Sequence, residues 1–470
     1  MAEATYDRVT FGRKVIYTDV ETITTENVAD VLEEAKNAHS SNRTDIQYLY
    51  DVYRGKMDIL ERQKEVRPEI CNMVPVNYPY RIVRFKTGYE FGEPIQYVAK
   101  SGENAYIEQF NAYMNEVDKD TQDIELSDWL YIAGIGYRYC NTDNDALPEE
   151  SPFKTSILDP RYTFCVYDRS IDHRQKFCCT FSEREDGTAT YYIYTDDSYF
   201  VIDADGNVSR EDYFGVEQPI TEYYYNASRL GAFEVVMSII NCINRVTSNR
   251  LDGIEQFIQA LMVFKGVNID AENFDTLKQE GAILVPAEGN VEYLIQELNQ
   301  GQTQTFVDSL YQEMLEIVGM PERSAGAAGG DNGIAVIYRN GWSDCESYAK
   351  SDEKMFKRGE KKFLKLAISL CNEQRGMDLK LSDISINFTR RNYENIAAKS
   401  EVLTSMLGSD KIHPKLAFIS SGMFPDPETA WSMSEEYQEE QERKEIKNLR
   451  REMREAEDTE VTVNAEEEEA

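Results

Sequence analysis

Histidine and recognisable catalytic motifs are scarce in this chain, and their scarcity narrows its chemistry. Only His39, His173 and His413 are present, so metal binding and acid–base catalysis have few candidate residues. The sequence contains no Gly-x-x-x-x-Gly-Lys-[Ser/Thr] phosphate loop, no His-Glu-x-x-His zinc motif and no Gly-x-Ser-x-Gly nucleophile elbow. We therefore expect no catalytic residues, no cofactor and no metal site.

Positive charge and long apolar runs are also in short supply. Lys and Arg number 50 against 85 Asp and Glu, which gives a formal net charge of −35, and no Lys/Arg-dense run makes a phosphate-binding patch obvious. Tight, sequence-independent DNA binding is therefore not expected, although an acidic wall would suit a DNA channel because phosphates do not adhere to it. No stretch approaches the roughly eighteen apolar residues of a membrane span, and residues 1–16 lack the apolar core of a signal peptide. We expect neither export nor membrane insertion.

The eight cysteines are dispersed, with no Cys-x-x-Cys motif. This distribution favours reduced thiols in a cytosolic setting. The only close pair is Cys178 and Cys179. A strand that points one thiol to each face of a sheet explains the pair better than a redox switch does.

The first half of the chain predicts mixed α and β structure. Helices are expected over residues 27–60, 105–115 and 122–132, and the last of them runs into a break at Gly134-Ile135-Gly136. Short β-branched or aromatic runs separated by turns then predict one antiparallel sheet, with strands at residues 137–140, 154–158, 163–167, 176–181, 188–194 and 199–203.

The second half predicts long helices around a small excursion. Residues 226–266 carry apolar side chains three or four apart and a second, polar stripe that includes Arg245, Asp252, Glu255 and Gln259. A helix of that length would extend about 60 Å, which indicates a rod in a larger assembly. A short helix at 270–280 and a hairpin of strands 282–285 and 291–294 are expected next.

A second helix at residues 303–318 is expected to stop at Gly319. The glycine-rich segment 322–333 cannot build a core, and a third long helix, interrupted by Gly341 and Gly359, follows at 334–371. A strand at 383–388 and helices from residues 393, 414 and 427 complete the folded part. Residues 435–457 predict a frayed helix, followed by a disordered acidic tail.

Several local runs resemble one family. Residues 77–94 contain an Asn, a helix and a Gly-Tyr-x-Phe-Gly-x-Pro turn, residues 226–234 begin the first long helix, and Met320-Pro321 precedes the glycine-rich segment and Gly333-Ile334-Ala335. Together with the order of elements, these runs resemble the portal (connector) proteins of tailed bacteriophages, of the siphophage type. Two residues depart from that pattern: Asn241 stands where Asp is common, and Asn332 replaces a Ser often seen there.

The resemblance implies an α+β portal fold with named parts. These are a mixed α/β wing (1–225), a stem helix (226–266), a small α/β clip (267–298), a second stem helix (299–320), a tunnel loop (321–333), a long spine helix (334–372), a wing return strand (373–394), a helical crown (395–434) and a charged, disordered tail (435–470).

The resemblance also implies a function. Portals form a ring, usually of twelve subunits, at one capsid vertex of the virion, and double-stranded DNA passes through without sequence specificity during packaging and ejection. The implied partners are the terminase large subunit, which supplies the ATPase, the major capsid and scaffolding proteins, and a head-completion or adaptor protein, with assembly in the host bacterial cytoplasm and no membrane.

The site residues implied by the resemblance fall in three groups. The tunnel loop contributes Glu322, Arg323, Ser324, Gly326, Gly329, Gly330, Asp331 and Asn332. The stem polar stripe contributes Arg245, Asp252, Glu255 and Gln259. The clip contributes Lys278, Glu288 and Asn290.

Two alternatives remain open at this point. The glycine-rich segment could bind a phosphorylated ligand in a cytosolic enzyme, although it lacks the Lys of a phosphate loop. The chain could instead be another head-assembly protein of a virion, which would also be acidic and oligomeric.

Overall fold

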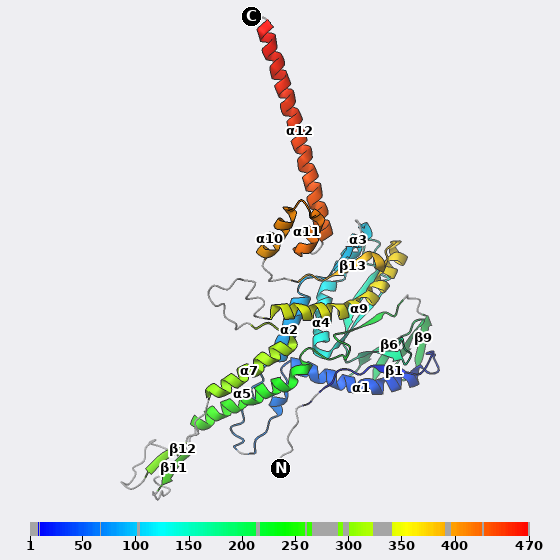
Figure 1. Ribbon diagram of the computed structural model, residues 1–470. Helices are drawn as coiled ribbons and strands as arrows, with labels where there is room; N and C mark the ends of the chain where they lie inside the picture. Colours follow the sequence, from blue (N-terminus) through cyan, green and yellow to red (C-terminus); the bar gives the residue numbers. More distant parts are fainter. Residues whose placement is uncertain are drawn as a thin grey trace.

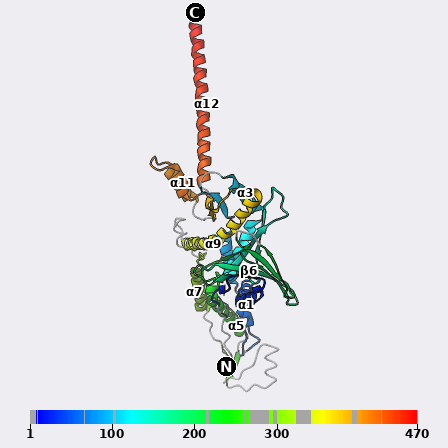
Figure 2. The same ribbon diagram turned by 90° about the vertical axis from the view of Figure 1, so that its right-hand side faces the viewer.

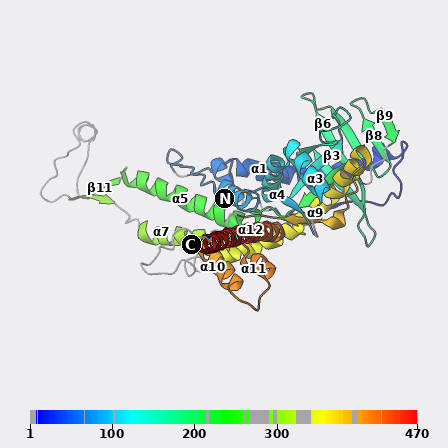
Figure 3. The ribbon, with the colours of Figure 1, turned by 90° about the horizontal axis from the view of Figure 1, so that it is seen from above.

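The computed structural model describes residues 8, 10–65, 67–100, 104–212, 217–258, 261–265, 290–294, 300–322, 341–390, 396–424 and 427–468. A body of helices and sheets forms the centre of the molecule (Figure 1). A pair of helices, α5 and α7, extends from one side of it, and the single long helix α12 rises from another (Figures 1 and 2). Seen from above, the sheets and the projecting pair lie at opposite ends (Figure 3).

The body contains two main sheets where the sequence predicts one. Strands β1 (Ile16–Thr18), β5 (Thr163–Asp168), β6 (Gln175–Glu183), β7 (Ala189–Tyr194), β8 (Ser198–Ile202) and β9 (Val208–Asp212) form the larger sheet in that order. Strands β10 (Ile220–Tyr224), β3 (Ile135–Thr142) and β4 (Phe153–Leu158) form the smaller one. The expectation of a purely antiparallel sheet is also wrong, because β1 runs parallel to β5. A long crossover separates these two strands, so no hairpin forces them to be antiparallel.

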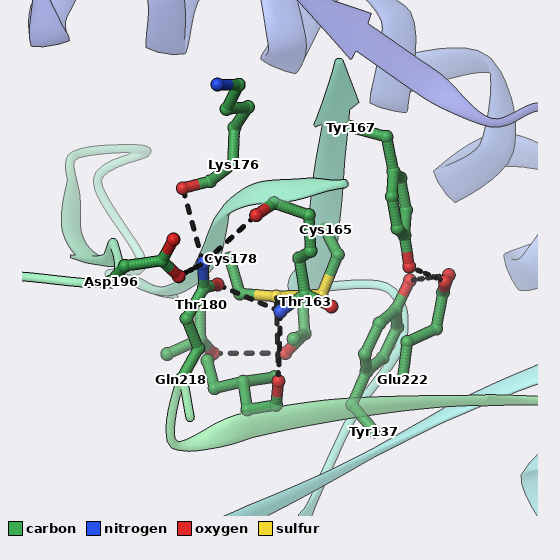
Figure 4. The surroundings of a disulfide bond; sticks show 12 residues. Tyr137, Thr163, Cys165, Tyr167, Lys176, Cys178, Thr180, Asp196, Gln218 and Glu222 are labelled. Carbon is green, nitrogen blue, oxygen red and sulfur yellow. Dashed lines mark hydrogen bonds between the residues drawn. A yellow bond between two sulfur atoms is a disulfide. The ribbon is translucent and has the colours of Figure 1, made fainter. Parts of the chain in front are cut away.

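The cysteine prediction is wrong for one pair and right for another. In the β5–β6 register Cys165 lies opposite Cys178, and the two form a disulfide (Figure 4). Dispersal along the sequence hides this pairing, because strand register decides which thiols meet. The vicinal pair behaves as expected, since Cys178 packs with Ile46 on one face of the sheet and Cys179 packs with Phe164 on the other.

Five helices complete the body: α1 (Val28–Tyr53), α2 (Tyr78–Glu90), α3 (Ala105–Glu116), α4 (Lys119–Ala133) and α9 (Trp342–Arg375). Asn77 caps α2 by accepting a hydrogen bond from the Tyr80 amide at 3.0 Å. Gly134, at a φ of +77°, ends α4 as predicted. The short strands β2 (Gln96–Ala99) and β13 (Ile384–Asn387) pair beside them. The largest hydrophobic cluster joins α2, α3, α4 and α9.

The projecting pair differs from the prediction at both ends of its first helix. Helix α5 begins at Met237, after a 3₁₀ turn at Glu234–Val236, and ends at Ile258. Arg229 has a φ of +53°, and the Asn226 side chain holds the Leu230 amide, so this segment turns before the helix starts.

The strand pairing beyond α5 also differs from the prediction. Strand β12 (Asn290–Leu294) pairs with β11 (Leu261–Lys265), a segment that the sequence predicts to lie inside the first long helix. The expected strand at 282–285 and helix at 270–280 lie outside the described residues. The second helix, α7 (Gln300–Val318), ends before Gly319, whose φ is +68°, as expected.

The described C-terminal region consists of three helices joined by turns. Helices α10 (Ile396–Leu407) and α11 (Pro414–Ser421) precede α12 (Pro427–Glu468). The expected disordered tail is thus a continuation of α12. Ion pairs at i,i+4 spacing support the helix, with Arg443 at 2.9 Å from Glu439 and Lys444 at 2.9 Å from Glu440.

Candidate functional site

The site residues that the sequence predicts are only partly within the described structure. Glu322 accepts a hydrogen bond from Gln312 Nε2 at 3.2 Å, which ties the start of the tunnel loop to α7. Asn290 begins β12 opposite Lys265. Arg323, Ser324, Gly326, Gly329, Gly330, Asp331, Asn332, Gln259, Lys278 and Glu288 lie outside the described residues.

The predicted polar stripe of α5 does not act as one surface. Arg245 is exposed and Glu255 is half-buried, whereas Asp252 is only 2% exposed. Asn241, Asn244 and Ser248 on the same helix are buried as well. Asp252 and these three polar residues therefore face a partner inside the chain.

That partner is the extended segment that precedes α2. The amides of Asn72, Val74 and Val76 donate hydrogen bonds to Asp252 Oδ1 at 2.7 Å, Ser248 Oγ at 3.0 Å and Asn244 Oδ1 at 3.0 Å respectively. Four residues of helix rise about 6 Å and two residues of extended chain about 6.6 Å, so alternate amides meet every fourth side chain. We call these three contacts the stem ladder.

The stem ladder ends in a cluster of charge around Asp252. Arg62 and Lys64 each approach Asp252 Oδ2 to 2.9 Å. Burial opposes ionisation of Asp252, but the hydrogen bonds from Asn72 and Lys64 outweigh it and lower the pKa of this carboxyl below its ordinary value. An ionised Asp252 therefore locks the segment 62–76 onto α5.

Sequence reasoning missed the stem ladder, although its signal is present. Three short polar acceptors at residues 244, 248 and 252 stand at successive four-residue steps along α5. Asn241 lies three residues before Asn244 and donates to Asp58 Oδ2 at 3.2 Å. An Asp at 241, which the family resemblance makes common, would here put two carboxylates in contact.

Buried charges join α9 to other elements of the body. Glu360 is completely buried, accepts hydrogen bonds from the hydroxyls of Tyr97 and Tyr223, and lies 3.0 Å from Lys119 Nζ. Burial opposes ionisation of Glu360, but Lys119 and the nearby Arg138 prevail and lower its pKa. This carboxylate ties α9 to β2, α4 and β10.

A second buried group ties α9 to α2. Lys86 Nζ lies 3.5 Å from Asp352 Oδ2. Burial and the charge of Asp352 raise the pKa of Glu90 to about 8. Two acids and one lysine therefore share this buried cluster, and burial favours the protonated form of Glu90.

The turn from α7 toward α9 is sterically fixed. Gly319 packs against the ring of Tyr348, where an added Cβ would lie 1.9 Å from a ring carbon. Its left-handed φ independently favours glycine. The described chain stops at Glu322, which is bonded to α7, and resumes at Gly341, at the start of α9.

The described residues offer little for other chemistry. Within them, no group of three or more His, Cys, Asp or Glu is placed to hold a metal ion. None of the helices searched in that same part of the chain is long and apolar enough to cross a membrane.

Comparison with known proteins identifies the family. Residues 32–448 match the family described as "Phage portal protein, SPP1 Gp6-like". No curated protein sequence matches significantly.

Solved structures with similar chains come from gene transfer agent (GTA) particles. A chain from the virion of the native particle has a TM-score of 0.43 and 11% identity, over 81% of this chain and 94% of that one. A chain from the neck of the native particle, computed with C12 symmetry, has a TM-score of 0.41 and 10% identity. The neck of the empty particle, computed with C6 symmetry, gives 0.44 and 10%. Both neck matches cover 74% of this chain and 91% of the other.

The structural scores are too low to carry an argument, so identification depends on the family match. That match spans most of the chain and agrees with the resemblance seen in the sequence, which is thereby confirmed. The chain belongs to the SPP1 Gp6-like family of phage portal proteins, structural components of phage-like particles.

Proposed function

We propose that this protein forms a closed ring of twelve copies at one capsid vertex and provides the channel for double-stranded DNA during packaging and ejection. Membership of the portal family over residues 32–448 is the observation that carries this proposal. The projecting pair supports it: two helices extend from an anchored body and end in the small β11–β12 sheet.

Exposed apolar side chains on the projecting pair favour neighbouring copies. Leu251 and Ile254 on α5 are 38% and 36% exposed, and Phe306 and Ile317 on α7 are 50% and 48% exposed. Rotationally related copies would bury these side chains against one another, because a head-to-tail interface that closes produces a ring.

Charge sets how DNA would pass. Each chain has a formal charge of −35, so a ring of twelve carries twelve times that charge. Most of the channel wall then repels phosphates. We assign transient DNA contact to the tunnel loop that starts at Glu322, and docking of the terminase large subunit and later of a head-completion or adaptor protein to the clip around Asn290. The body would meet the capsid and scaffolding proteins in the host cytoplasm.

Electron microscopy of the purified chain, with light scattering in the same buffer, tests the ring. We expect rings with a central channel and a mass near twelve times 54.1 kDa. Phe306→Glu should shift the population toward smaller species, whereas Glu313→Gln, at an exposed position on the same helix, should not. A monomer at every concentration would overturn the proposal.

A further inference from the structure

The segment 443–454 of α12 carries an unusual concentration of positive charge. Its sequence, Arg-Lys-Glu-Ile-Lys-Asn-Leu-Arg-Arg-Glu-Met-Arg, has six cations and two acids in a chain whose net charge is −35. Acidic residues dominate on both sides of it. The neighbouring glutamates make this segment easy to overlook in the sequence. The statement that no Lys/Arg-dense run makes a phosphate-binding patch obvious needs revision for these residues.

Helix formation collects the cations on one face. At about 100° per residue, Arg443, Lys444, Lys447 and Arg450 fall within an arc of about 120°. All four are exposed. The sequence continues with Arg451 and Arg454 at three- and four-residue spacings from these positions. We call these six residues the α12 basic face.

The middle of the α12 basic face has no acid to neutralise it within the helix. The four positions three and four residues from Lys447 are Arg443, Lys444, Arg450 and Arg451. Arg450 likewise has only Ile446, Lys447, Met453 and Arg454 at those spacings. Like charges at these spacings destabilise a helix by about 0.2–0.5 kcal/mol per pair. The outer cations differ, because Arg443 and Lys444 pair with Glu439 and Glu440.

The rest of the chain leaves this face accessible. Helix α12 packs on α11 near its own start, where Trp431 contacts the Phe418 ring at 5.7 Å between centroids. Beyond that contact α12 extends away from the body (Figures 1 and 2). Tyr437 and Ile446 are 63% and 51% exposed. An external polyanion can therefore reach the four described cations, Arg443, Lys444, Lys447 and Arg450.

We propose that the α12 basic face binds the phosphate backbone of double-stranded DNA. The inference depends on the proposed function, because a ring turns twelve separate patches into a belt. Copies related by rotation alone have no axial offset, so the segment 443–454 lies at one height in every copy. That belt is a local attractive zone on an otherwise repulsive particle.

Ring symmetry also disfavours the nearest competing partner, the glutamates of an adjacent copy. To place the acidic residues 435–442 of one α12 beside the basic face of another requires an axial shift of about 12 Å. Parallel copies in a rotational ring lack that shift, so cations face cations across the interface. Duplex DNA supplies phosphates at the required density without any such displacement.

Salt-dependent binding to a duplex of unrelated sequence tests the proposal on the full chain. We expect the assembled protein to bind in fluorescence anisotropy and the double variant Lys447→Gln/Arg450→Gln to lose about tenfold or more in affinity. The slope of log K against log salt should fall by about two, since each lost phosphate contact removes about 0.9. The matched control, Lys361→Gln/Lys362→Gln at exposed positions of α9, should keep both values.

Several outcomes would overturn the proposal. The proposal would be wrong if the protein did not bind the duplex at low salt, or if the two double variants bound it equally well. Preference for vesicles of phosphatidylserine and phosphatidylcholine over the duplex would assign the face to a membrane instead. Electron microscopy of the same samples separates the two levels: rings without DNA binding contradict this inference alone, whereas absence of rings contradicts the proposed function.

Discussion

Helices α9 and α12 are both long and both rich in charge, yet the fold treats them in opposite ways. In α9, Glu360 and Asp352 find cations inside the body, and twelve residues of the helix are buried. In α12, described contacts with the rest of the chain gather near its start, and its charges between residues 435 and 450 are exposed to solvent. The comparison shows that the number of charged residues in a helix does not predict whether the helix is buried or what it does. What matters is whether opposite charges from other elements reach it.

Removal of the Glu360 carboxylate from α9 is expected to lower the free energy of unfolding more than any other change considered. Glu360→Ala leaves Lys119 and Arg138 with Asp123 as their only acid in this buried group, and loss of one partner from a buried ion pair costs about 3–5 kcal/mol. Thermal or denaturant unfolding of the full chain measures this loss. Glu373→Ala, at an exposed position of the same helix, should change stability by no more than about 0.5 kcal/mol. Equal effects of the two variants would contradict the assignment.

Acid should weaken the body through His39. Burial lowers the pKa of His39 to about 4 from its ordinary 6.5, with a smaller contribution from the charge of Arg43. The folded state thus binds this proton only at a lower pH than the unfolded state does. The contribution of neutral His39 to the free energy of unfolding is therefore fully present above pH 6.5 and is lost as the pH falls toward 4. The total loss is about 3 kcal/mol. Denaturant titrations at several pH values should show this slope in wild type.

The control for this titration is built into the chain. His39→Gln should remove that pH dependence, whereas His173→Asn, at an exposed site with a φ of +46°, should retain it. A slope that survives His39→Gln would show that another group governs the response.

Loss of the stem ladder is expected to have a local effect, intermediate in size between the effects of changes in α9 and in α12. Asp252→Ala removes the acceptor for Asn72 and the counter-ion of Lys64, and hydrogen bonds to charged groups contribute about 1.5–3 kcal/mol each. We expect segment 62–76 to exchange amide hydrogens faster, with the body unaffected. Hydrogen exchange read by mass spectrometry should locate the change at residues 72–76. If amide exchange became faster throughout the body of the variant, the stem ladder would instead stabilise the whole fold.

The smallest effect is expected on α12. Lys447→Glu converts like-charge spacings into opposite ones, so the helix should gain a few tenths of a kcal/mol per pair. Global unfolding should not move, because this part of α12 has no described tertiary contact. Hydrogen exchange over residues 443–450 should slow slightly, and DNA affinity should fall. A lowered unfolding temperature would show that the α12 basic face packs against protein.

Local chemistry made much of this structure predictable. The glycine that ends α4 and the strands of the body are short-range signals, and each appears close to its predicted place. The order of elements along the chain likewise pointed to the portal family. Boundaries failed where tertiary contacts prevailed, as at β11, which pairs with β12 rather than extending α5.

The candidate site was less predictable, because the sequence shows its polar residues but not the residues to which they bond. The stripe on α5 was visible, but nothing in the sequence tells that residues 72–76 lie along it. Cys165 and Cys178 meet for the same kind of reason, through strand register.

By itself the sequence determined the helical and strand segments, the acidic charge and the family, because these depend on neighbouring residues and on composition. Only the tertiary structure decided which charges meet an opposite charge: Asp252 and Glu360 pair with lysines from distant segments, whereas among the described residues no ion pair joins Lys447 or Arg450 to a distant acid. The physical reason is that Coulomb attraction between side chains acts over a few ångströms, and the fold alone sets those distances.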